Sequence, residues 1–233
     1  MSRLWTFGDS FTFGDGCNPY DDYYKQYPEK VSLKWNQLVA NHYNYELKDF
    51  SKNGAPNSWI LRQLVNNIDK IEQGDLVSIN FTGPFRFEVP NPNQTDDLQP
   101  VLSQLINQEN SLFEEFAPNS NENTAIYNYI KYIYLMDIYK NDKKVTEGYQ
   151  LIDRFIQRQF NSICRLFKKN NIKFIKWTWD TPGFINKFHT ITDCTDGKID
   201  NFHPSWKGHN QMAKSIISSF EKNINTIPLN RFL

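Results

Sequence analysis

The chain has 233 residues, of which 39% are hydrophobic, so it is long enough to bury one sizeable core. Lys and Arg together number 26, as do Asp and Glu, which leaves no net charge to hold nucleic acid or an acidic membrane surface. No run of about 18 apolar residues occurs, so we expect no membrane span and neither kind of partner.

Strand-like and helix-like patterns alternate from the beginning of the chain. Leu4 to Phe7 is a short apolar run typical of a buried strand, and Gly8 allows a sharp turn after it. Apolar residues then recur at helical spacing from Trp35 to His42, so His42 is predicted to be a packed core histidine. Tyr45 to Phe50 has the pattern of a second strand.

The same alternation continues into the next unit. Ser51 to Asn57 is a predicted turn, and Gly74-Asp75 closes the helix that follows it. Leu76 to Phe81 is a third predicted strand. Such a strand, helix, strand order implies parallel pairing with right-handed crossovers, so the sequence predicts the α/β class. The inward face of the helix is expected to carry Trp59, Leu61, Leu64, Val65, Ile68 and Ile71.

An insertion interrupts the alternation between about residues 83 and 148, within a single domain that spans 1–233. Its Pro- and Asn-rich stretches show no regular period. A Tyr-rich helix is expected from Thr124 to Tyr139, and its tyrosines either pack the insertion against the body or form a platform on which a sugar stacks. We expect the insertion to hold what is particular to this protein.

Regular elements return after the insertion. Leu151 to Phe167 predicts a long helix that leads into a strand from Ile172 to Trp177. After a loop, Ser205 is placed to cap a last helix that runs through Phe220.

Two short motifs at opposite ends of the chain supply a serine, an acid and a histidine. Ser10 follows the first strand, and ligands of open α/β sheets bind beyond the carboxyl ends of strands. Asp200 and His203 precede the last helix at a spacing that lets the carboxylate reach one ring nitrogen while the other faces the serine. The sequence therefore predicts acyl transfer, in which Ser10 attacks, His203 accepts its proton and Asp200 orients the imidazole.

These motifs resemble the first and last blocks of the SGNH, or GDSL, hydrolases. The matching residues are Gly8-Asp9-Ser10-Phe11-Thr12-Phe13-Gly14 and Asp200-Asn201-Phe202-His203-Pro204, the latter followed by Gly208-His209. The Gly-x-Ser-x-Gly elbow of the α/β-hydrolases is not present at Ser10. The resemblance covers the chain outside the insertion. It implies a three-layer α/β/α sandwich with a parallel flavodoxin-like sheet, and a serine esterase or acylhydrolase that needs no metal and no organic cofactor.

The resemblance also implies an oxyanion hole. Gly54 matches the glycine of the second block, whose N–H joins that of Ser10 in stabilising the oxyanion. The third block departs from the family, because Thr82 and Pro84 stand where a glycine and an asparagine are usual. The side-chain donor of the family is therefore missing. The Thr82 hydroxyl is our preferred substitute, and Asn80 is the alternative if the strand end is bulged.

Three further residues are predicted to bind substrate: Asn57, Asn80 and Trp179. Asn57 either caps the helix that follows it or points into the pocket. Trp177 and Trp179 flank a strand end on the ligand side of the sheet, where one of them lines the pocket.

Hydrolysis of a carboxylic ester is the predicted function. Family analogy and an aromatic content of 15% favour a small O-acyl group on a carbohydrate as the substrate. The alternative is a catalytically weak or inactive glycan-binding or structural protein that kept the hydrolase scaffold. A lipid esterase would need an apolar groove from the insertion, which is polar and Asn-rich.

The cysteines and histidines indicate neither a disulfide framework nor a metal site. The three cysteines are an odd number without CxxC spacing, and the four histidines show no metal-binding spacing. No secretory leader is visible at the N-terminus. We therefore expect a protein of the reducing cytoplasm, and the oligomeric state is left open.

Overall fold

A parallel sheet forms the centre of the molecule. The computed structural model describes residues 1–17, 25, 33–83, 86–91, 94–102, 156, 158–179, 188, 190 and 202–223. All the pairings within this sheet are parallel, and its strands lie in the order β2-β1-β3-β6. The strands are β1 (Arg3–Gly8), β2 (Glu46–Ser51), β3 (Leu76–Phe81) and β6 (Lys173–Thr178).

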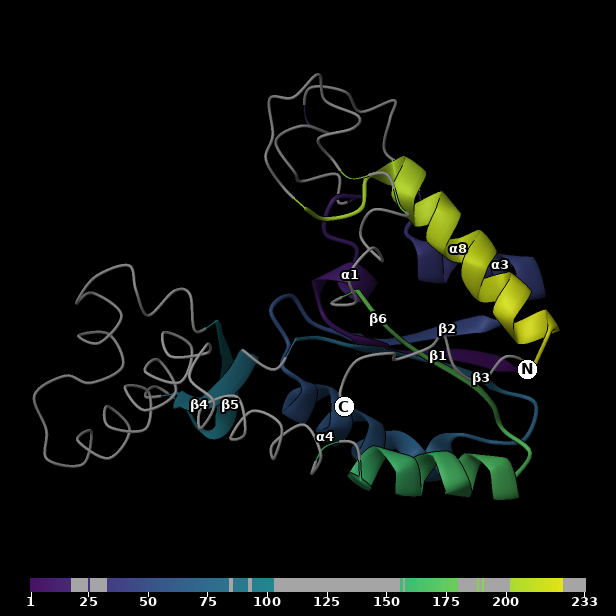
Figure 1. Cartoon of the computed structure of the whole chain (residues 1–233). Coiled ribbons are helices and arrows are strands. Elements are labelled where there is room, and N and C mark those ends of the chain that lie inside the picture. Colours follow the sequence, from purple (N-terminus) through teal and green to yellow (C-terminus); the bar gives the residue numbers. More distant parts are fainter. Residues whose placement is uncertain are drawn as a thin grey trace, which may run out of the picture.

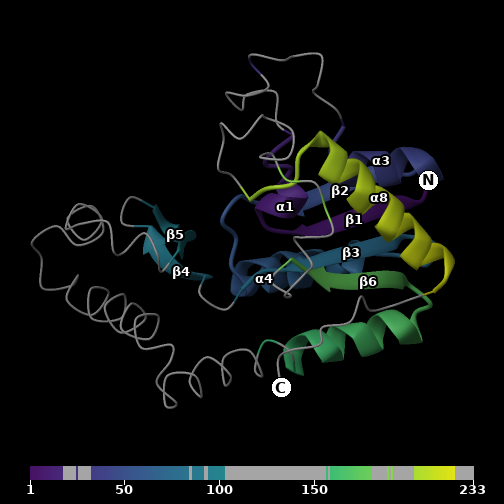
Figure 2. The ribbon, with the colours of Figure 1, turned by 45° about the horizontal axis from the view of Figure 1, so that its top comes forward.

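Helices cover both faces of the sheet (Figures 1 and 2). Helices α3 (Trp35–Tyr43) and α8 (Trp206–Glu221) lie on one face. Helix α4 (Asn57–Asn67), which continues as the short 3-10 helix η2 (Ile68–Lys70), lies on the other face beside the helix of residues 158–169. The fold is thus the predicted three-layer α/β/α sandwich.

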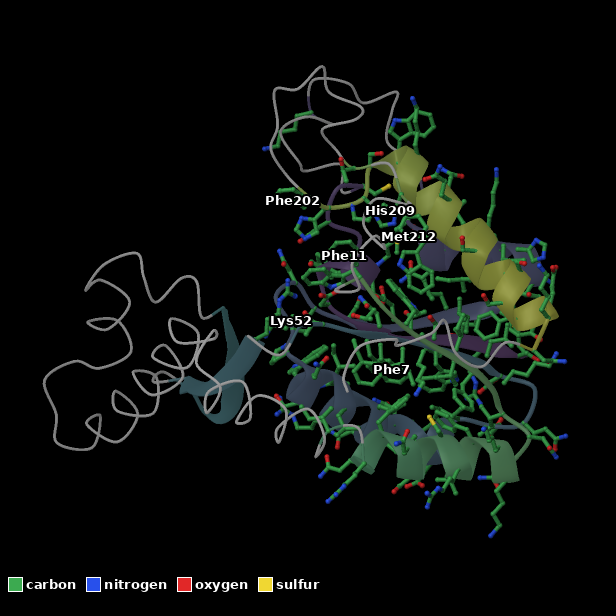
Figure 3. The ribbon with its side chains drawn as sticks, viewed as in Figure 1. Phe7, Phe11, Lys52, Phe202, His209 and Met212 are labelled. Atoms are coloured by element: carbon green, nitrogen blue, oxygen red, sulfur yellow. The ribbon has the colours of Figure 1, made fainter. Side chains whose placement is uncertain are left out.

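Strand β1 supplies side chains to both apolar layers because successive residues of a strand point to opposite faces. Leu4 and Phe7 are both fully buried. Leu4 packs in the layer that also holds Met212 of α8, whereas Phe7 packs in the layer that holds Leu64 of α4. Figure 3 shows Phe7 and Met212 on the two sides of the sheet. A central strand that is buried on both faces reads as a continuous apolar run, which is why the sequence reveals it.

Most predicted elements are confirmed to within a residue or two at each end. Ser205 is the N-cap of α8, and its hydroxyl accepts a hydrogen bond from the Gly208 N–H at 3.4 Å, as predicted. Of the predicted helix Leu151 to Phe167, the described residues from 158 onward are helical. The predicted Tyr-rich helix Thr124 to Tyr139 lies outside the described residues.

The prediction that His42 packs in the core is wrong. Its side chain is 47% exposed and lies 3.7 Å from a carboxylate oxygen of Glu221 at the end of α8. Helix α3 buries Trp35, Asn36, Val39 and Ala40 instead. His42 stands in the last turn of a nine-residue helix. The apolar pattern in the sequence therefore extends beyond the buried part of the helix, which ends at Ala40.

The insertion contains a β-hairpin that the sequence analysis missed. Strands β4 (Arg86–Asn91) and β5 (Gln94–Leu102) pair in antiparallel fashion. Pro90 and Pro100 lie within these strands, and proline in a run normally argues against a strand because it cannot donate to the ladder. The hairpin lies beside the carboxyl ends of the sheet (Figures 1 and 2). None of the helices among the described residues is long and apolar enough to span a membrane.

Gly8 is required by close packing rather than by a left-handed backbone. A Cβ added at Gly8 would lie 2.2 Å from Thr12 Oγ1 and 2.9 Å from Asn80 Cβ. We expect Gly8→Ala to lower the free energy of unfolding by about 1–3 kcal/mol, as overpacking does, measured by urea denaturation. Because Thr12 is the nearest neighbour, the same change should cost less in a Thr12→Ala background. Strictly additive effects would contradict this account.

Candidate active site

Ser10 lies at the carboxyl end of the central strand. Strand β1 ends at Gly8, and Asp9 is the N-cap of the short helix α1 (Ser10–Phe13), accepting a hydrogen bond from the Phe11 N–H at 3.1 Å. Ser10 is thus the first residue of α1, where backbone N–H groups have no partner inside the helix. Figure 1 shows α1 directly beyond the end of the sheet. The local sequence therefore places the hydroxyl at the edge where open α/β sheets bind ligands.

His203 meets Ser10 from the other end of the chain. Its Nε2 lies 2.8 Å from Ser10 Oγ, across 193 residues of sequence. In the neutral tautomer that carries its proton on Nδ1, the ring accepts the Ser10 hydroxyl proton at Nε2. The imidazole also packs against the Phe11 ring, with the ring centroids 5.3 Å apart. The structure thus brings together two of the three residues predicted for acyl transfer.

The third predicted residue, Asp200, lies outside the described residues. A different carboxylate stands near the imidazole among those described. Asp15 Oδ2 lies 3.8 Å from His203 Nε2, on the nitrogen that also meets Ser10. Asp15 follows Gly14, the C-cap of helix α1, so the segment that carries Ser10 also holds an acid close to the ring.

The surroundings of His203 keep its imidazole neutral. Burial, with a smaller contribution from the Arg86 guanidinium, lowers the pKa of His203 to about 4. At neutral pH the ring is therefore uncharged, and its contact with Asp15 is not an ion pair. Uncharged imidazole is the form that accepts a proton from an alcohol.

A buried carboxylate organises the polar groups behind Ser10. Asp9 is fully buried and accepts hydrogen bonds from Asn80 Nδ2 at 2.6 Å, Arg86 Nη1 at 2.8 Å and Trp179 Nε1 at 2.6 Å. Burial raises the pKa of Asp9, and the Arg86 charge and the hydrogen bond from Trp179 oppose that effect. Because each of these partners is a donor, the carboxylate is the form of Asp9 that satisfies them.

Both side chains predicted as substitute oxyanion donors face Asp9. The Thr82 hydroxyl is buried and lies near enough to the carboxylate to lower the pKa of Asp9, although it forms no hydrogen bond of good geometry among the described residues. Asn80 is fully buried and donates to Asp9. The bulge on which the Asn80 alternative depended is not present, because β3 pairs with β6 in continuous register up to Phe81.

Gly54 adopts a left-handed backbone, with φ of +72°, and a Cβ added there would meet nothing within 4 Å. The conformation of the turn, and not a lack of space, favours glycine at this position.

Of the two alternatives predicted for Asn57, capping of the following helix is wrong. Pro56 is the N-cap of α4, and Asn57 is the first residue of the helix. Its side-chain Nδ2 donates to Thr82 O at 2.7 Å, and its Oδ1 accepts from Thr82 N at 2.8 Å. The amide thus ties the start of α4 to the end of β3. Sequence spacing could not reveal this contact, because it joins two elements 25 residues apart.

The two tryptophans at the end of β6 have different surroundings. Trp177 is 1% exposed and donates to Ser78 Oγ at 3.0 Å, so it belongs to the core. Trp179 is only partly buried and stacks on Phe11 with ring centroids 4.9 Å apart and an interplanar angle of 5°. Of this pair, Trp179 is the one that lies beside the Ser10 and His203 contact.

Residues 4–216 match the model of the GDSL-like lipase/acylhydrolase family. The chain belongs to this family. The match includes both strands that flank β1 and the segments that carry Ser10 and His203. Membership places the protein among hydrolases. Curated protein sequences contain no match to it.

Several solved structures are similar to this GDSL family member. A lipolytic protein of the G-D-S-L family from Desulfitobacterium hafniense is 13% identical, with a TM-score of 0.33, covering 97% of this chain and 77% of that one. A member of the same family from Veillonella parvula is 13% identical, with a TM-score of 0.37 and coverages of 95% and 100%. A catalytic mutant of an acetylxylan esterase from Geobacillus stearothermophilus is 11% identical, with a TM-score of 0.33 and coverages of 94% and 94%.

Sequence reasoning missed two charged residues of this GDSL site, Asp15 and Arg86. Asp15 stands between Gly14 and Gly16, which both have positive φ, at 100° and 85°. A carboxylate in a glycine turn so close to Ser10 was a usable signal. Arg86 is a lone cation between two phenylalanines in the sequence, a few residues after the third strand. Among the described residues, no three His, Cys, Asp or Glu side chains gather where they could hold a metal ion.

A second histidine of the GDSL protein, His209, is part of its internal support. It is fully buried in α8; its Nδ1 accepts from the Trp35 N–H at 3.3 Å, and its Nε2 lies 3.4 Å from Asp15 O. Figure 3 shows it beneath α8, on the α1 side of the sheet. Burial is the main cause that lowers the pKa of His209 to about 4. The neutral ring therefore joins α3, α8 and the turn after α1.

Acid should destabilise the protein through this buried histidine. The folded-state pKa of His209 lies below the ordinary histidine value of about 6.5, so the unfolded chain binds the proton first and stability is lost as the pH falls from about 6.5 to about 4. We expect His209 to contribute a loss on the order of 3 kcal/mol across this window, and His203, whose pKa is also lowered to about 4, to add a similar loss; urea denaturation at several pH values measures the total. His209→Gln should therefore reduce the slope by about half, and His42→Gln, at an exposed histidine, should leave it unchanged. Equal slopes in wild type and His209→Gln would contradict the assignment.

Proposed function

We propose that the protein hydrolyses carboxylic esters through an acyl-enzyme on Ser10. The observation that carries the proposal is the 2.8 Å contact between His203 Nε2 and Ser10 Oγ at the carboxyl end of the sheet. Membership in a family of lipases and acylhydrolases supports the same chemistry. A nucleophile and a base in direct contact, with the base uncharged at neutral pH, is the arrangement that activates an alcohol.

In the first half of the reaction, Ser10 Oγ attacks the ester carbonyl carbon while His203 Nε2 takes the hydroxyl proton. A C–O bond forms, and the carbonyl π pair moves onto the oxygen, which becomes an oxyanion. The N–H groups of Ser10 and Gly54 stabilise this charge in our proposal. When the intermediate collapses, the bond to the leaving oxygen breaks, and His203 returns the proton to the departing alcohol.

In the second half, water replaces the alcohol. His203 takes a proton from the water as its oxygen attacks the acyl carbon, and collapse returns the proton to Ser10 Oγ and releases the acid. Asp200 is proposed to orient His203 throughout by holding the proton on Nδ1. The reaction consumes one ester and one water and needs no other reactant.

We propose a small O-acyl group on a carbohydrate as the substrate. Phe202 is 69% exposed and immediately precedes His203, and Figure 3 shows it at the rim beyond Phe11. It offers aromatic surface against which a sugar ring stacks in our proposal, whereas the Trp179 ring already stacks on Phe11 and lies under the Arg86 guanidinium, so that we assign Trp179 to the wall of the pocket. Asn57 and Asn80 are engaged with Thr82 and Asp9, so we now assign them to the support of the pocket rather than to contact with the substrate. The cytoplasmic location stays a prediction.

Labelling with a fluorophosphonate tests the mechanism. The reagent forms a covalent bond with an activated serine, and mass spectrometry of the digested protein should place it on Ser10. A panel of p-nitrophenyl esters of increasing acyl length should show highest turnover for acetate. Absence of both labelling and turnover would rule out the esterase. Highest turnover on long acyl chains would replace the small-acyl substrate with a lipid-like one.

One observation favours a second candidate function, that of a weakly active or inactive glycan-binding protein. Both side chains that were predicted as oxyanion donors, Thr82 and Asn80, face Asp9 instead. Loss of one oxyanion donor typically lowers kcat by a factor of about 10²–10³. This candidate predicts that acetylated oligosaccharides bind in calorimetry without being hydrolysed. Release of acetate from the same oligosaccharides would exclude it.

A further inference from the structure

Arg86 is the first residue of β4, and its side chain extends to the residues around Ser10. Its Nη1 donates to Asp9 Oδ2 at 2.8 Å, and Asp9 is the residue directly before Ser10. Its guanidinium also lies over the Trp179 ring, with Cζ 5.2 Å from the ring centroid. The Arg86 guanidinium is held by an ion pair on one side and by an aromatic ring on the other, so it has little freedom to move. Its position relative to Ser10 is therefore set before any substrate arrives.

One N–H donor of the Arg86 guanidinium is buried and makes no hydrogen bond among the described residues. The Arg86 side chain is 9% exposed, and its Nε–H is buried with no hydrogen-bond partner among the described residues. Buried polar groups are nearly always paired, so an orphaned donor calls for an explanation such as a catalytic role. A guanidinium stays protonated throughout the physiological range, and this N–H is therefore a permanent donor.

The charge of Arg86 also acts on the reacting pair. It contributes to the lowered pKa of His203, which places the guanidinium within electrostatic range of the imidazole that bonds to Ser10. The Asn80 amide donates to the Asp9 carboxylate, and the Thr82 hydroxyl lies near enough to Asp9 to lower the pKa of that carboxylate, although it forms no hydrogen bond among the described residues. Arg86 satisfies Asp9 with one nitrogen and keeps another for a second acceptor. Near Ser10, the negative charge that develops during ester cleavage is on the former carbonyl oxygen.

We propose that Arg86 is a catalytic residue that donates its Nε–H to the oxyanion formed on Ser10, as the third donor beside the N–H groups of Ser10 and Gly54. This inference rests on the proposed ester hydrolysis. It explains how a chain with Thr82 and Pro84 after its third strand still stabilises the intermediate. The ion pair with Asp9 is then a positioning contact, and the stack on Trp179 keeps the guanidinium plane fixed.

Two variants of Arg86 test the proposal. Arg86→Lys keeps the charge and the partner for Asp9 but has no second N–H at the position of Nε, and Arg86→Ala removes the whole group. Both should lower kcat for p-nitrophenyl acetate by about 10²–10³-fold, with KM changed by less than about threefold. The rate of Ser10 labelling by a fluorophosphonate should fall in parallel, because the phosphoryl oxygen takes the place of the oxyanion. Arg158→Ala, at an exposed arginine, is the control.

Chemical rescue separates a donor from a merely structural residue. Methylguanidinium added to Arg86→Ala should restore part of the lost kcat, whereas ammonium at the same concentration should not. Thermal denaturation checks that each variant is folded, and if Arg86→Ala does not fold, Arg86→Lys decides. Folded variants that keep wild-type kcat, or that lose activity through KM alone, would overturn the assignment and leave the esterase proposal intact. A wild-type protein without any Ser10-dependent turnover would overturn both.

Discussion

Ser10→Ala should lower kcat/KM for p-nitrophenyl acetate by at least about a thousandfold, because the reaction loses its nucleophile and with it the acyl-enzyme. The residual rate would come from binding and from the oxyanion donors alone. The variant should fold normally, since the serine side chain is small and, within the part of the chain that the structure describes, its hydroxyl makes one hydrogen-bond contact, with His203 Nε2 at 2.8 Å. Initial rates at several substrate concentrations, with circular dichroism as the check on folding, measure the effect.

Ser219→Ala is a matched control for this experiment. Ser219 is a buried serine whose hydroxyl donates one hydrogen bond, also at 2.8 Å, to Ser215 O in α8. Ser219 lies near the C-terminal end of α8, whereas His203 lies just before the N-cap Ser205 at the other end. We therefore expect wild-type rates for this variant. If Ser10→Ala and Ser219→Ala both turned over ester like the wild type, Ser10 would not be the nucleophile and only the architecture would remain.

His203→Gln should lower kcat by about 10²–10⁴-fold, the usual contribution of a positioned general base. Glutamine keeps a polar side chain of similar reach but does not accept and return a proton near neutral pH. Stopped assays with p-nitrophenyl acetate and fluorophosphonate labelling should both report the loss. His42→Gln is the control, because His42 is an exposed histidine on α3. A similar loss in both variants would point to a general effect on the fold.

The pH dependence of the wild type should reveal the environment of His203. With a pKa near 4, the imidazole is uncharged in the free enzyme at neutral pH, so log kcat/KM should rise with pH through about 4 and be level from about pH 6. Activity is lost toward acid because protonated His203 has no lone pair to accept the Ser10 proton. An inflection near pH 6.5 would instead mean that burial and Arg86 do not depress the pKa of the working base.

The strands were predictable because burial on both faces leaves a continuous apolar run in the sequence. β3 was placed at Leu76–Phe81, as found, and the other three strands within one residue. Helix faces were predicted less well, since Val65, expected on the inward face of α4, is 52% exposed. His42 shows the limit, since the apolar spacing of α3 outlasts its contact with the core. The β4 and β5 hairpin was missed because its prolines carry the signal of a loop.

At the site, the sequence indicated Ser10 and His203 because their chemistry is local: a small turn after a strand and a histidine just before a capped helix. Asp9, by contrast, was visible only as part of a motif. Its role emerges from partners at Asn80, Arg86 and Trp179, which lie 71, 77 and 170 residues away. No pattern of spacing along the chain encodes such contacts.

By itself, the sequence determined the class of fold, the serine and histidine, and the departure of the third block from its family. Those features depend on residue type and on periods of two or about four residues, which a linear chain displays directly. The tertiary structure alone decided where Arg86, Asn57 and Thr82 act. Their partners depend on the order of the strands in the sheet, because that order brings the carboxyl ends of β1, β3 and β6 to one edge. The buried Asp9 carboxylate accepts hydrogen bonds from donors on several elements, because burying an unpaired charge would cost a large free energy.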